Sequence, residues 1–466
     1  MEKRSYDITV IGGGPGGYVA AIRAAQLGAK VLLIEKDQVG GTCTNRGCIP
    51  TKTMLADARM FERVRLSSVV KAENLRVDME QLQDRKNKVV KRMITGVEFL
   101  LKDNGITFLR GKASFLDRKT IEAEVEKGKE QFGSEKVIIA TGSVSAQIPN
   151  VAVDGKVILT STEMLNVPSI PQDLVIIGGG YIGMEFACLF SGLGSKVTVI
   201  EMLPQIISTE DEEVIRGLTT LLKKRGIRIH AETKVNEAKA KDGRAEVKVI
   251  HQDGKEEVIQ AEKALMAVGR SPYTEGLRLE KAGVALEGKF VKVNERMETS
   301  SPGIYAIGDV TGRQMLAHKA SAEGIVAAEN ARGRPNKVDY SKIPNCIFTL
   351  PEVASIGLTE KQAKEKGLRV RIGRYPFQSN GKALANGDSE GFVKVIADQE
   401  LGQVIGVHIL GDHATDLIGG LSVAMTLETT VEELGKTVQA HPTLMEAVAE
   451  ASLDAIKEAI HLQKKR

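Results

Sequence analysis

Two cysteines lie close together near the start of this 466-residue chain, in the stretch Gly40-Gly-Thr-Cys43-Thr-Asn-Arg-Gly-Cys48-Ile-Pro-Thr-Lys52. The Cys-x₄-Cys spacing is not the usual structural zinc spacing, and no Cys or His nearby in the sequence completes a tetrahedron. A pair of inert core cysteines is the alternative, because small buried cysteines are common. We favour a redox-active disulfide on the helix that follows a glycine turn, since amide N–H groups and Lys52 can stabilise a thiolate there.

A glycine-rich turn precedes these cysteines and is typical of a dinucleotide-binding unit. A predicted strand over 6–11 leads into a GxGxxG motif, and a predicted helix follows over 18–27. The glycines of the motif are Gly12, Gly14 and Gly17. They allow a tight turn, close approach to a pyrophosphate and close packing of helix on strand. A second strand, over 30–34, leads to Glu35, whose carboxylate can accept hydrogen bonds from ribose hydroxyls.

The same pattern recurs 166 residues further along the chain. A predicted strand over 173–177 leads into a second GxGxxG motif, then a helix, then a strand that ends at Glu201. The glycines of this copy are Gly178, Gly180 and Gly183. In both copies the glutamate stands 23 residues after the first glycine. One such motif is weak evidence, but two with matching offsets indicate that the chain binds two dinucleotides.

The cysteine pair indicates which nucleotide each unit binds. Nicotinamide does not usually exchange electrons with thiols directly, whereas a flavin accepts them from a thiolate and passes hydride onward. We therefore predict FAD in the first unit and NAD in the second. No arginine follows Glu201 to receive a 2′-phosphate, and like charges 4 Å apart repel by about 4 kcal/mol at an effective dielectric constant of 20. A segment over 299–309 is predicted as a strand that ends in Gly-Asp, and its Asp309 is a candidate to bind the ribityl chain of the flavin. In isolation Asp309 would be read as a turn residue.

These motifs, in this order, resemble those of the flavoprotein disulfide reductases, most closely the members that oxidise dihydrolipoyl groups, and the resemblance covers nearly the whole chain. It implies that Cys43 is the outer thiol, which reacts with substrate, and that Cys48 is the inner thiolate beside the flavin. Lys52 and Glu185 resemble an ion pair next to the flavin. Further matching positions are Ala113 near the adenine, Thr141 and Gly142 in the crossover between the nucleotide-binding domains, Ala317 near the flavin, and Val235 and Gly269 near the nicotinamide nucleotide.

A histidine near the C-terminus completes the catalytic set that the resemblance implies. By itself His441, which precedes a proline, would be read as a turn residue. The segment His-Pro-Thr-x-x-Glu matches the catalytic segment of the family, which implies that His441 is the base and that Glu446 orients it. An ordinary imidazole titrates near pH 6.5, so such a base works close to neutral pH. The resemblance also implies a homodimer in which this histidine lies opposite the cysteine pair of the other subunit.

The remaining histidines and cysteines are predicted to have surface, structural or core-packing roles. The histidines are His230, His251, His318, His408, His413 and His461, and the cysteines are Cys188 and Cys346. No metal site is expected among them.

The motifs together predict an α/β protein with two Rossmann-like dinucleotide-binding domains and a C-terminal α+β dimerisation domain. We expect the FAD-binding domain to take residues 1–146 and 274–343, the NAD-binding domain residues 147–273, and the dimerisation domain residues 344–466.

The composition excludes several other classes of protein. Hydrophobic residues make up 42% of the chain and charged residues 27%, which excludes wholesale disorder. The 64 basic and 60 acidic residues leave a net charge of +4 and no concentrated basic field for a nucleic acid. No apolar run reaches the roughly 18 residues of a membrane span, and residues 8–11 are predicted to form a strand, not part of a signal peptide. Four cysteines do not make an extracellular disulfide scaffold, so we expect a cytoplasmic or organelle-matrix protein.

The expected activity is a relay of two electrons from a dihydrolipoyl group, through the cysteine pair and FAD, to NAD. The dihydrolipoyl group would be carried by the acyltransferase of a 2-oxo acid dehydrogenase complex or by the H protein of the glycine cleavage system. One alternative is a reductase for glutathione disulfide or mercuric ion, which Glu201 and the lack of a vicinal cysteine pair in Leu462-Gln-Lys-Lys-Arg466 argue against. Another is a flavin- and NAD-binding redox sensor, which would not need a placed base such as His441.

Overall fold

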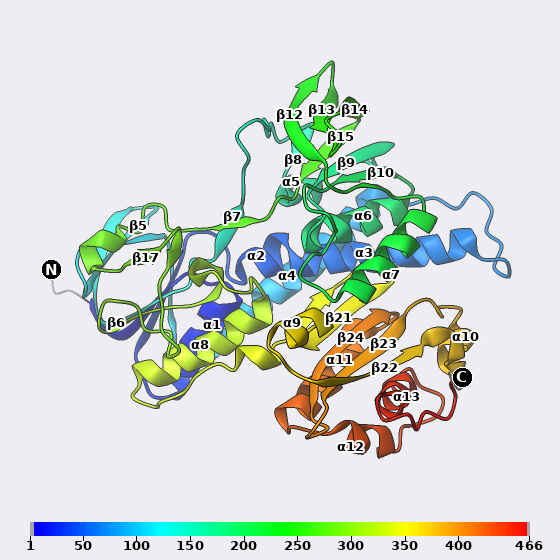
Figure 1. Ribbon diagram of the computed structural model, residues 1–466. Helices are drawn as coiled ribbons and strands as arrows, with labels where there is room; N and C mark the ends of the chain where they lie inside the picture. Colours follow the sequence, from blue (N-terminus) through cyan, green and yellow to red (C-terminus); the bar gives the residue numbers. More distant parts are fainter. Residues whose placement is uncertain (1–3, 464–466) are drawn as a thin grey trace.

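Three main sheets organise the chain into three lobes (Figure 1). The computed structural model describes residues 4–463, and residues 464–466 of the C-terminal tail lie outside the described part. Two long helices, α3 (Cys48–Leu66) and α4 (Met79–Asp103), accompany the sheets. Shorter elements complete the lobes: α2 (Gly41–Arg46), α5 (Ser161–Met164), α9 (Glu360–Glu365), α10 (Gly381–Asn386), β17 (Leu286–Glu287) and β18 (Phe290–Val291). Within residues 4–463, none of the helices combines the length and the apolar character that a bilayer span requires.

The first sheet has seven strands and a parallel centre. Its order is β3-β2-β1-β6-β5-β4, and β19 also pairs with β6. The strands are β1 (Arg4–Ile11), β2 (Val31–Glu35), β3 (Thr107–Arg110), β4 (Lys112–Phe115), β5 (Thr120–Val125), β6 (Gly128–Ile139) and β19 (Ile304–Ala306). Every residue of β2 is buried, as is typical of a parallel strand that is covered on both faces. Helix α1 (Pro15–Gln26) packs on this sheet and against α8 (Ala317–Ala331), which comes from much later in the chain.

The second sheet repeats the strand–loop–helix–strand unit of the first. Its five strands run in the order β11-β10-β9-β15-β8, all parallel, and a three-stranded antiparallel sheet, β12-β13-β14, lies beside it. The strands are β8 (Ile158–Leu159), β9 (Asp173–Ile177), β10 (Lys196–Ile200), β11 (Arg228–His230), β12 (Lys234–Lys241), β13 (Arg244–Ile250), β14 (Glu256–Ala261) and β15 (Lys263–Met266). The helices are α6 (Tyr181–Leu193) and α7 (Glu212–Lys224).

Two short antiparallel strands, β7 (Ser143–Ser145) and β16 (Arg270–Pro272), connect the two nucleotide-binding units. The chain leaves the first unit through β7 and returns through β16, as the resemblance of residues 140–143 to a crossover implies (Figure 1). The predicted fold class, with two Rossmann-like units, is therefore confirmed, while the residue limits of the domains stay predictions.

The third sheet is antiparallel and belongs to the C-terminal lobe. Its order is β20-β21-β24-β23-β22, and α11 packs on β21 and β24 while α13 packs on β22 and β23. The elements are β20 (Asn345–Ile347), β21 (Glu352–Gly357), β22 (Val370–Pro376), β23 (Phe392–Asp398), β24 (Val404–Gly411), α11 (Ala414–Thr426), α12 (Val431–Lys436) and α13 (Glu446–Ala455). This lobe has a separate core of buried apolar residues between sheet and helices.

One predicted strand is shorter than expected. The strand predicted over 299–309 is reduced to β19, because a turn at Pro302-Gly303 precedes it. The turn is closed by hydrogen bonds from Thr299 N–H to Ile304 O at 2.9 Å and from Ile304 N–H to Ser301 O at 3.1 Å. A 3₁₀ turn over Gly308–Thr311 follows the strand, so that Asp309 lies in this turn at the end of the sheet.

Candidate active site

The two N-terminal cysteines form a disulfide that links two consecutive helices. Cys43 lies on α2, Cys48 is the first residue of α3, and their Cα atoms are 4.7 Å apart. The prediction of one helix for both cysteines is wrong, because the backbone at Gly47 is not helical (φ −144°, ψ −110°). Pro50 lies in the first turn of α3, where its missing N–H would have no partner in any case. The sulfur of Cys48 is thus held at a helix N-terminus, which favours its thiolate.

A cavity of about 870 Å³ joins this disulfide to the first glycine loop and to the second nucleotide-binding unit. The residues predicted as cofactor neighbours or thiols that line it are Gly12, Gly14, Glu35, Cys43, Cys48, Lys52, Ala113, Thr141, Gly142, Glu185, Asp309 and Ala317. Tyr181, Ile182 and Phe186 of α6 line it as well. One continuous space therefore borders a nucleotide loop, a redox pair and the helix that follows the second glycine motif.

The first glycine of each motif occupies the same position in its unit. Gly12 has φ +104° and Gly178 has φ +111°, values that favour glycine. A Cβ atom on Gly12 would lie 2.3 Å from Ala140 O, and one on Gly178 would lie 2.3 Å from Ala267 O. Each loop is therefore packed directly on the end of a neighbouring parallel strand, and no other residue fits there.

The other motif glycines divide into packing and open positions. A Cβ on Gly17 would lie 1.9 Å from Gly12 O, and one on Gly183 would lie 2.0 Å from Gly178 O. By contrast, a Cβ on Gly14 would meet only a backbone atom at 3.8 Å, and one on Gly180 would meet nothing within 4 Å. The middle glycines thus border open space at a helix N-terminus, where a phosphate can approach the backbone.

The glutamates that end the second strands make the same contacts in both units. Glu35 Oε2 accepts a hydrogen bond from Gly13 N–H at 2.7 Å, and Glu201 Oε2 accepts one from Gly179 N–H at 2.6 Å. Each carboxylate also accepts the N–H two residues after itself, at 2.9 and 2.7 Å respectively. These bonds fix both carboxylates beside the glycine loops, the position predicted from their equal offsets.

Lys52 and Glu185 form an ion pair between α3 and α6. Lys52 Nζ lies 2.6 Å from Glu185 Oε2, and Phe348 N–H donates to the other oxygen at 3.0 Å. The ammonium also lies 4.4 Å from the centre of the Phe348 ring. Because Lys52 follows Cys48 by four residues on the same helix, its charge lies on the face that carries the sulfur.

The predicted Asp309 belongs to a charged network at the cavity that was not itself predicted from the sequence. Ser143 Oγ donates to Asp309 Oδ2 at 2.5 Å, and Arg270 Nε donates to the same hydroxyl at 2.6 Å. Burial lowers the pKa of Arg270, and the carboxylate of Asp309 opposes this shift. Thr141 donates to Tyr273 O at 2.6 Å and helps to fix the same crossover. These contacts pass between β7, β16 and the turn after β19, so no local sequence pattern could reveal them.

His441 and Glu446 form a pair on the surface of the C-terminal lobe. Their side chains meet at 2.8 Å through Nδ1 and Oε1, and Thr443 N–H donates to Glu446 Oε2 at 2.8 Å. Partial burial raises the pKa of Glu446, but the bonds from Thr443 and His441 outweigh it, so the net shift is downward. The His441 side chain is 77% exposed, and this residue is not among those that line the cavity. Figure 1 shows α13, which begins at Glu446, in a different lobe from α2.

Four further predicted residues have different surroundings. Val235 lies in β12 and packs against the core of the second unit, and Gly269, with φ +114°, directly precedes β16. Cys188 is buried in the core, as predicted, and it also accepts a hydrogen bond from the backbone N–H of Leu350. Cys346 is only partly buried and lines the cavity, where burial raises the pKa of its thiol to about 11.

Comparison with known proteins decides the family. The pyridine nucleotide-disulphide oxidoreductase family matches residues 6–324, and the dimerisation domain of the same family matches residues 343–452. The chain belongs to the pyridine nucleotide-disulphide oxidoreductases. This oxidoreductase therefore carries a dimerisation domain as its C-terminal lobe and forms a homodimer.

Relatives of this oxidoreductase match it over nearly its whole length. A dihydrolipoyl dehydrogenase of Bacillus subtilis (strain 168) is 42% identical and covers 98% of this chain and 99% of its own. The mitochondrial dihydrolipoyl dehydrogenase of Pisum sativum is 39% identical, with 98% and 92% covered. Among solved structures, LpdA from Mycobacterium tuberculosis superimposes with a TM-score of 0.90 at 27% identity, with 96% of this chain and 99% of that chain covered.

Proposed function

We propose that this oxidoreductase oxidises dihydrolipoyl groups to lipoyl groups and reduces NAD⁺ to NADH, using the Cys43–Cys48 disulfide and bound FAD. The observation that carries the proposal is the single cavity that borders the first glycine loop, the disulfide and helix α6. The names of relatives at about 40% identity over the full length supply the substrate class.

The residues around the cavity fit FAD. The open space at Gly14 lies at the N-terminus of α1, where a pyrophosphate is favoured, and Glu35 lies beside it for a ribose. The disulfide, Lys52 and Ala317 line the same space, so a ring system bound there lies beside a sulfur and a cation. FAD, when bound, carries two electrons between a thiolate and a nicotinamide.

The thiol chemistry is carried by residues of the chain itself. A substrate thiol loses its proton to His441, and the thiolate attacks Sγ of Cys43. The Cys43–Cys48 bond breaks and Cys48 leaves as a thiolate. The second substrate thiol then displaces Cys43, to which its proton passes, and closes the lipoyl disulfide. The ammonium of Lys52, held by its ion pair to α6, stabilises the charge on Cys48.

The base in this scheme belongs to the other subunit of the dimer. His441 is exposed and lies outside the cavity of its own chain, as a residue that acts across an interface must. Glu446 accepts from Nδ1 of the imidazole and so leaves Nε2 available for the substrate proton. The tautomer follows from this hydrogen bond, since an ionised carboxylate can only accept.

The choice of NAD over NADP rests on Glu201. Its carboxylate is fixed beside the second glycine loop, and the following residues 202–206 contain no cation. A 2′-phosphate would meet a negative charge with no compensating arginine. The substrate arm would be carried by an acyltransferase or by the H protein of the glycine cleavage system. A thiol pair that must cycle through its reduced form suits the cytoplasm or an organelle matrix.

A steady-state assay tests the proposal. In the forward direction the holoenzyme receives dihydrolipoamide as the reductant, with either NAD or NADP as the acceptor. In the reverse direction it receives NADH or NADPH as the reductant, with either glutathione disulfide or Hg(II) as the acceptor. We expect multiple turnovers with dihydrolipoamide and NAD, and loss of turnover in Cys43→Ser. Preferred turnover of glutathione disulfide or Hg(II) would contradict the substrate class. One stoichiometric oxidation without turnover would instead favour a redox sensor.

A further inference from the structure

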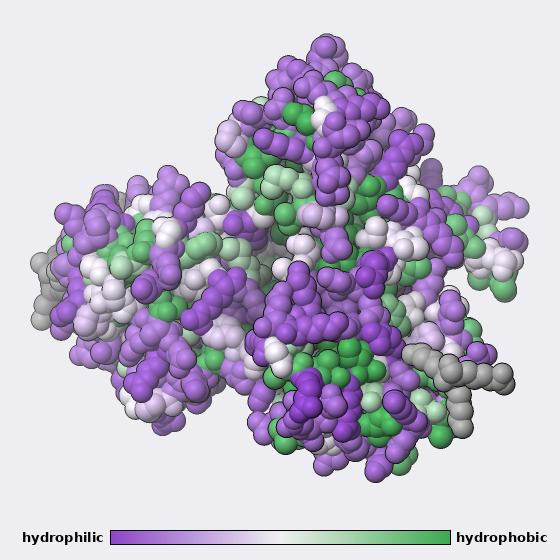
Figure 2. Space-filling model, viewed as in Figure 1, coloured by the Kyte–Doolittle hydropathy of each residue, from purple (hydrophilic) through white to green (hydrophobic). Residues whose placement is uncertain are grey.

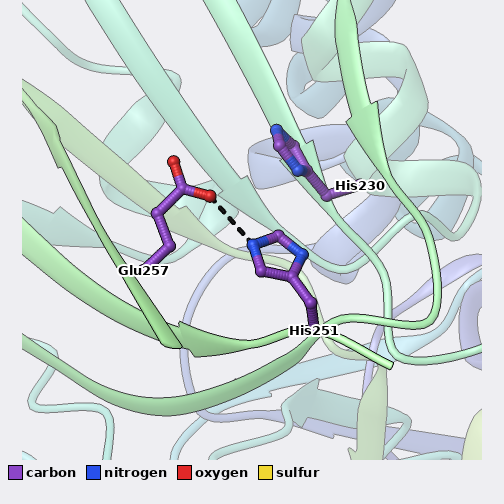
Figure 3. Close-up of side chains that lie close together, drawn as sticks. All are labelled: His230, His251 and Glu257. Carbon is purple, nitrogen blue, oxygen red and sulfur yellow. Dashed lines mark hydrogen bonds and ion pairs between the residues drawn. The ribbon is translucent and has the colours of Figure 1, made fainter. Parts of the chain in front are cut away.

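Three potential metal ligands that the proposed activity does not use meet at one edge of the second unit (Figure 3). His230 ends β11, His251 follows β13, and Glu257 lies on β14. One ligand atom from each lies within 4.8 Å of the other two. Within residues 4–463 this is the one such group of His, Cys, Asp or Glu. The prediction that both histidines have surface or structural roles does not explain their convergence.

Hydrogen bonding places one nitrogen of His251 against a carboxylate, in a position where a cation can bind to both. Thr233 Oγ1 donates its hydrogen to Ala231 O at 2.9 Å, so it can only accept from His251 Nδ1, which lies 3.3 Å away. The proton of a neutral His251 is then on Nδ1, and Nε2 carries a lone pair. Nε2 lies 2.8 Å from Glu257 Oε2, which is also an acceptor. Two acceptors this close require a proton or a cation between them.

The surrounding residues hold the ligands as a metal site requires. Thr233 is buried, with 2% exposure, and orients the His251 ring from the side opposite the carboxylate. The His230 ring lies 5.6 Å from that of His251, centre to centre, at 45°. Figure 3 shows the two imidazoles one above the other, with Glu257 pointing toward them. Ligand atoms around a tetrahedral ion with bonds of about 2.0–2.2 Å lie roughly 3.3 Å apart, so small side-chain rotations complete the site.

We propose that His230, His251 and Glu257 bind Zn²⁺ or a similar divalent transition-metal ion, with water in the remaining position. Two imidazoles with one carboxylate favour such ions over Mg²⁺ or Ca²⁺, which prefer oxygen ligands. The side chains of His251 and Glu257 are 21% and 44% exposed, so an ion can reach the site from solvent.

The site is directly connected to the second nucleotide loop. Glu201 N–H donates to His230 O at 2.9 Å, and Thr233 N–H donates to Glu201 O at 2.9 Å. The segment over 230–233 thus brackets the backbone of the glutamate that the proposed function assigns to the NAD ribose. A bound ion fixes this segment to the β13–β14 hairpin, and we therefore expect it to change the KM for NAD. This consequence, unlike the metal site itself, rests on the proposed function.

Equilibrium dialysis of the oxidised holoenzyme against Zn²⁺ tests the site, because the intact disulfide withholds two thiols from the metal. We expect one tightly bound Zn²⁺ per chain, and a Kd at least about 100-fold higher in His251→Ala and in Glu257→Gln. His461→Ala is the matched control, since His461 also meets one glutamate at 2.8 Å but belongs to no three-ligand group among the described residues. It should bind Zn²⁺ as the unmodified protein does.

Two results would overturn the proposal. One is equal Zn²⁺ binding by the unmodified protein and both ligand variants, and the other is loss of binding in Cys346→Ser with binding retained in His251→Ala. Melting temperatures measured in EDTA establish that the variants are folded, and a rise on adding Zn²⁺ should be confined to proteins with all three ligands. KM for NAD, measured with Zn²⁺ and with EDTA, is a separate readout. If Zn²⁺ binds at the three ligands but the KM for NAD does not change, only the link to Glu201 is contradicted.

Discussion

At the scale of single residues, the duplicated glutamates provide a comparison within one molecule. Glu35 and Glu201 each accept hydrogen bonds from the equivalent pair of backbone N–H groups in their own unit, and both are held beside a glycine loop. Their different roles in the proposed function therefore come from what each loop binds, not from a difference in local geometry. A substitution at one of them should affect one nucleotide only.

Glu201→Gln combined with Met202→Arg should increase the use of NADP. The change removes a negative charge from the ribose position and adds a cation at a residue that is 66% exposed. We expect the NADP-to-NAD ratio of kcat/KM to rise by up to about three orders of magnitude, from the 4 kcal/mol scale of such charge pairs. Glu35→Gln is the matched control, and it should weaken FAD retention without altering the ratio. An unchanged ratio in the double variant would place specificity elsewhere.

The two cysteines should differ in their spectra after reduction. Cys48 lies at the N-terminus of α3, four residues before Lys52, and is assigned as the thiolate beside the flavin. Anaerobic two-electron reduction should produce a long-wavelength charge-transfer band in the unmodified protein. Cys48→Ser should abolish the band, because no thiolate remains next to the ring. Cys43→Ser should show the band without any reductant, because Cys48 is then free of the disulfide while the flavin is still oxidised. A band that persists in Cys48→Ser would reverse the assignment of the two thiols.

At the scale of elements, a buried charge network joins α7 of the second unit to the C-terminal sheet. Lys394 on β23 is 1% exposed and donates to Asp211 at 2.9 Å, Glu213 at 2.8 Å and Glu360 at 2.8 Å. Arg374 on β22 also binds Glu213, at 2.5 Å. Because the cation is enclosed by three carboxylates from two elements, it holds the nucleotide-binding unit and the dimerisation lobe together.

Lys394→Met should destabilise the protein strongly. Removing the cation leaves Asp211, which is 2% exposed, as an uncompensated buried charge, and such a loss costs about 3–5 kcal/mol. Chemical denaturation should show this decrease in the free energy of unfolding. Adding Asp211→Asn to this variant should restore part of the lost stability, because asparagine removes the buried charge and still caps α7. No recovery in the double variant would show that packing of the Lys394 stem, not charge, causes the loss.

The same network predicts a dependence of stability on pH. The hydrogen bond from Arg374, followed by those from Lys394, lowers the pKa of Glu213 to about 2. A carboxyl whose pKa is lowered on folding stabilises the protein above its unfolded pKa, near 4.5, and this contribution is lost as the pH falls toward 2. Melting temperatures between pH 6 and pH 3 should fall less steeply in Glu213→Gln than in the unmodified protein. Equal slopes of melting temperature against pH in the two proteins would contradict the lowered pKa of Glu213.

The elements also show what a sequence can reveal. The strand predicted over 173–177 coincides with β9, and both glycine loops were identified, because strand, turn and helix are encoded by adjacent residues. Contacts between distant segments could not be predicted in this way. Lys394 meets Asp211 across 183 residues, and the three ligands of the proposed metal site come from β11, from the residue after β13 and from β14. Only the register of the folded sheets brings such side chains together.

At the scale of the whole molecule, the C-terminal lobe exposes apolar side chains of the kind that are typical of a subunit interface. Val423, Leu427 and Val438 are 60%, 74% and 94% exposed. Figure 2 shows apolar side chains gathered on the face of this lobe. A homodimer formed through this lobe buries apolar surface, and the proposed function requires that it also bring the exposed His441 to a second copy of the chain. Each proposed active site then takes its cysteines from one subunit and its base from the other.

Subunit complementation tests this sharing. Cys48→Ser and His441→Gln homodimers should each be nearly inactive with dihydrolipoamide and NAD. After unfolding and refolding of an equal mixture, half of the dimers are mixed, and each mixed dimer holds one site with an intact disulfide and an intact histidine. We therefore expect about a quarter of the unmodified activity in the refolded mixture, because a two-fold dimer has two equivalent sites. If both groups came from the same chain, every site would lack one of them and no activity would return. Refolding each variant alone is the control, and it should restore none.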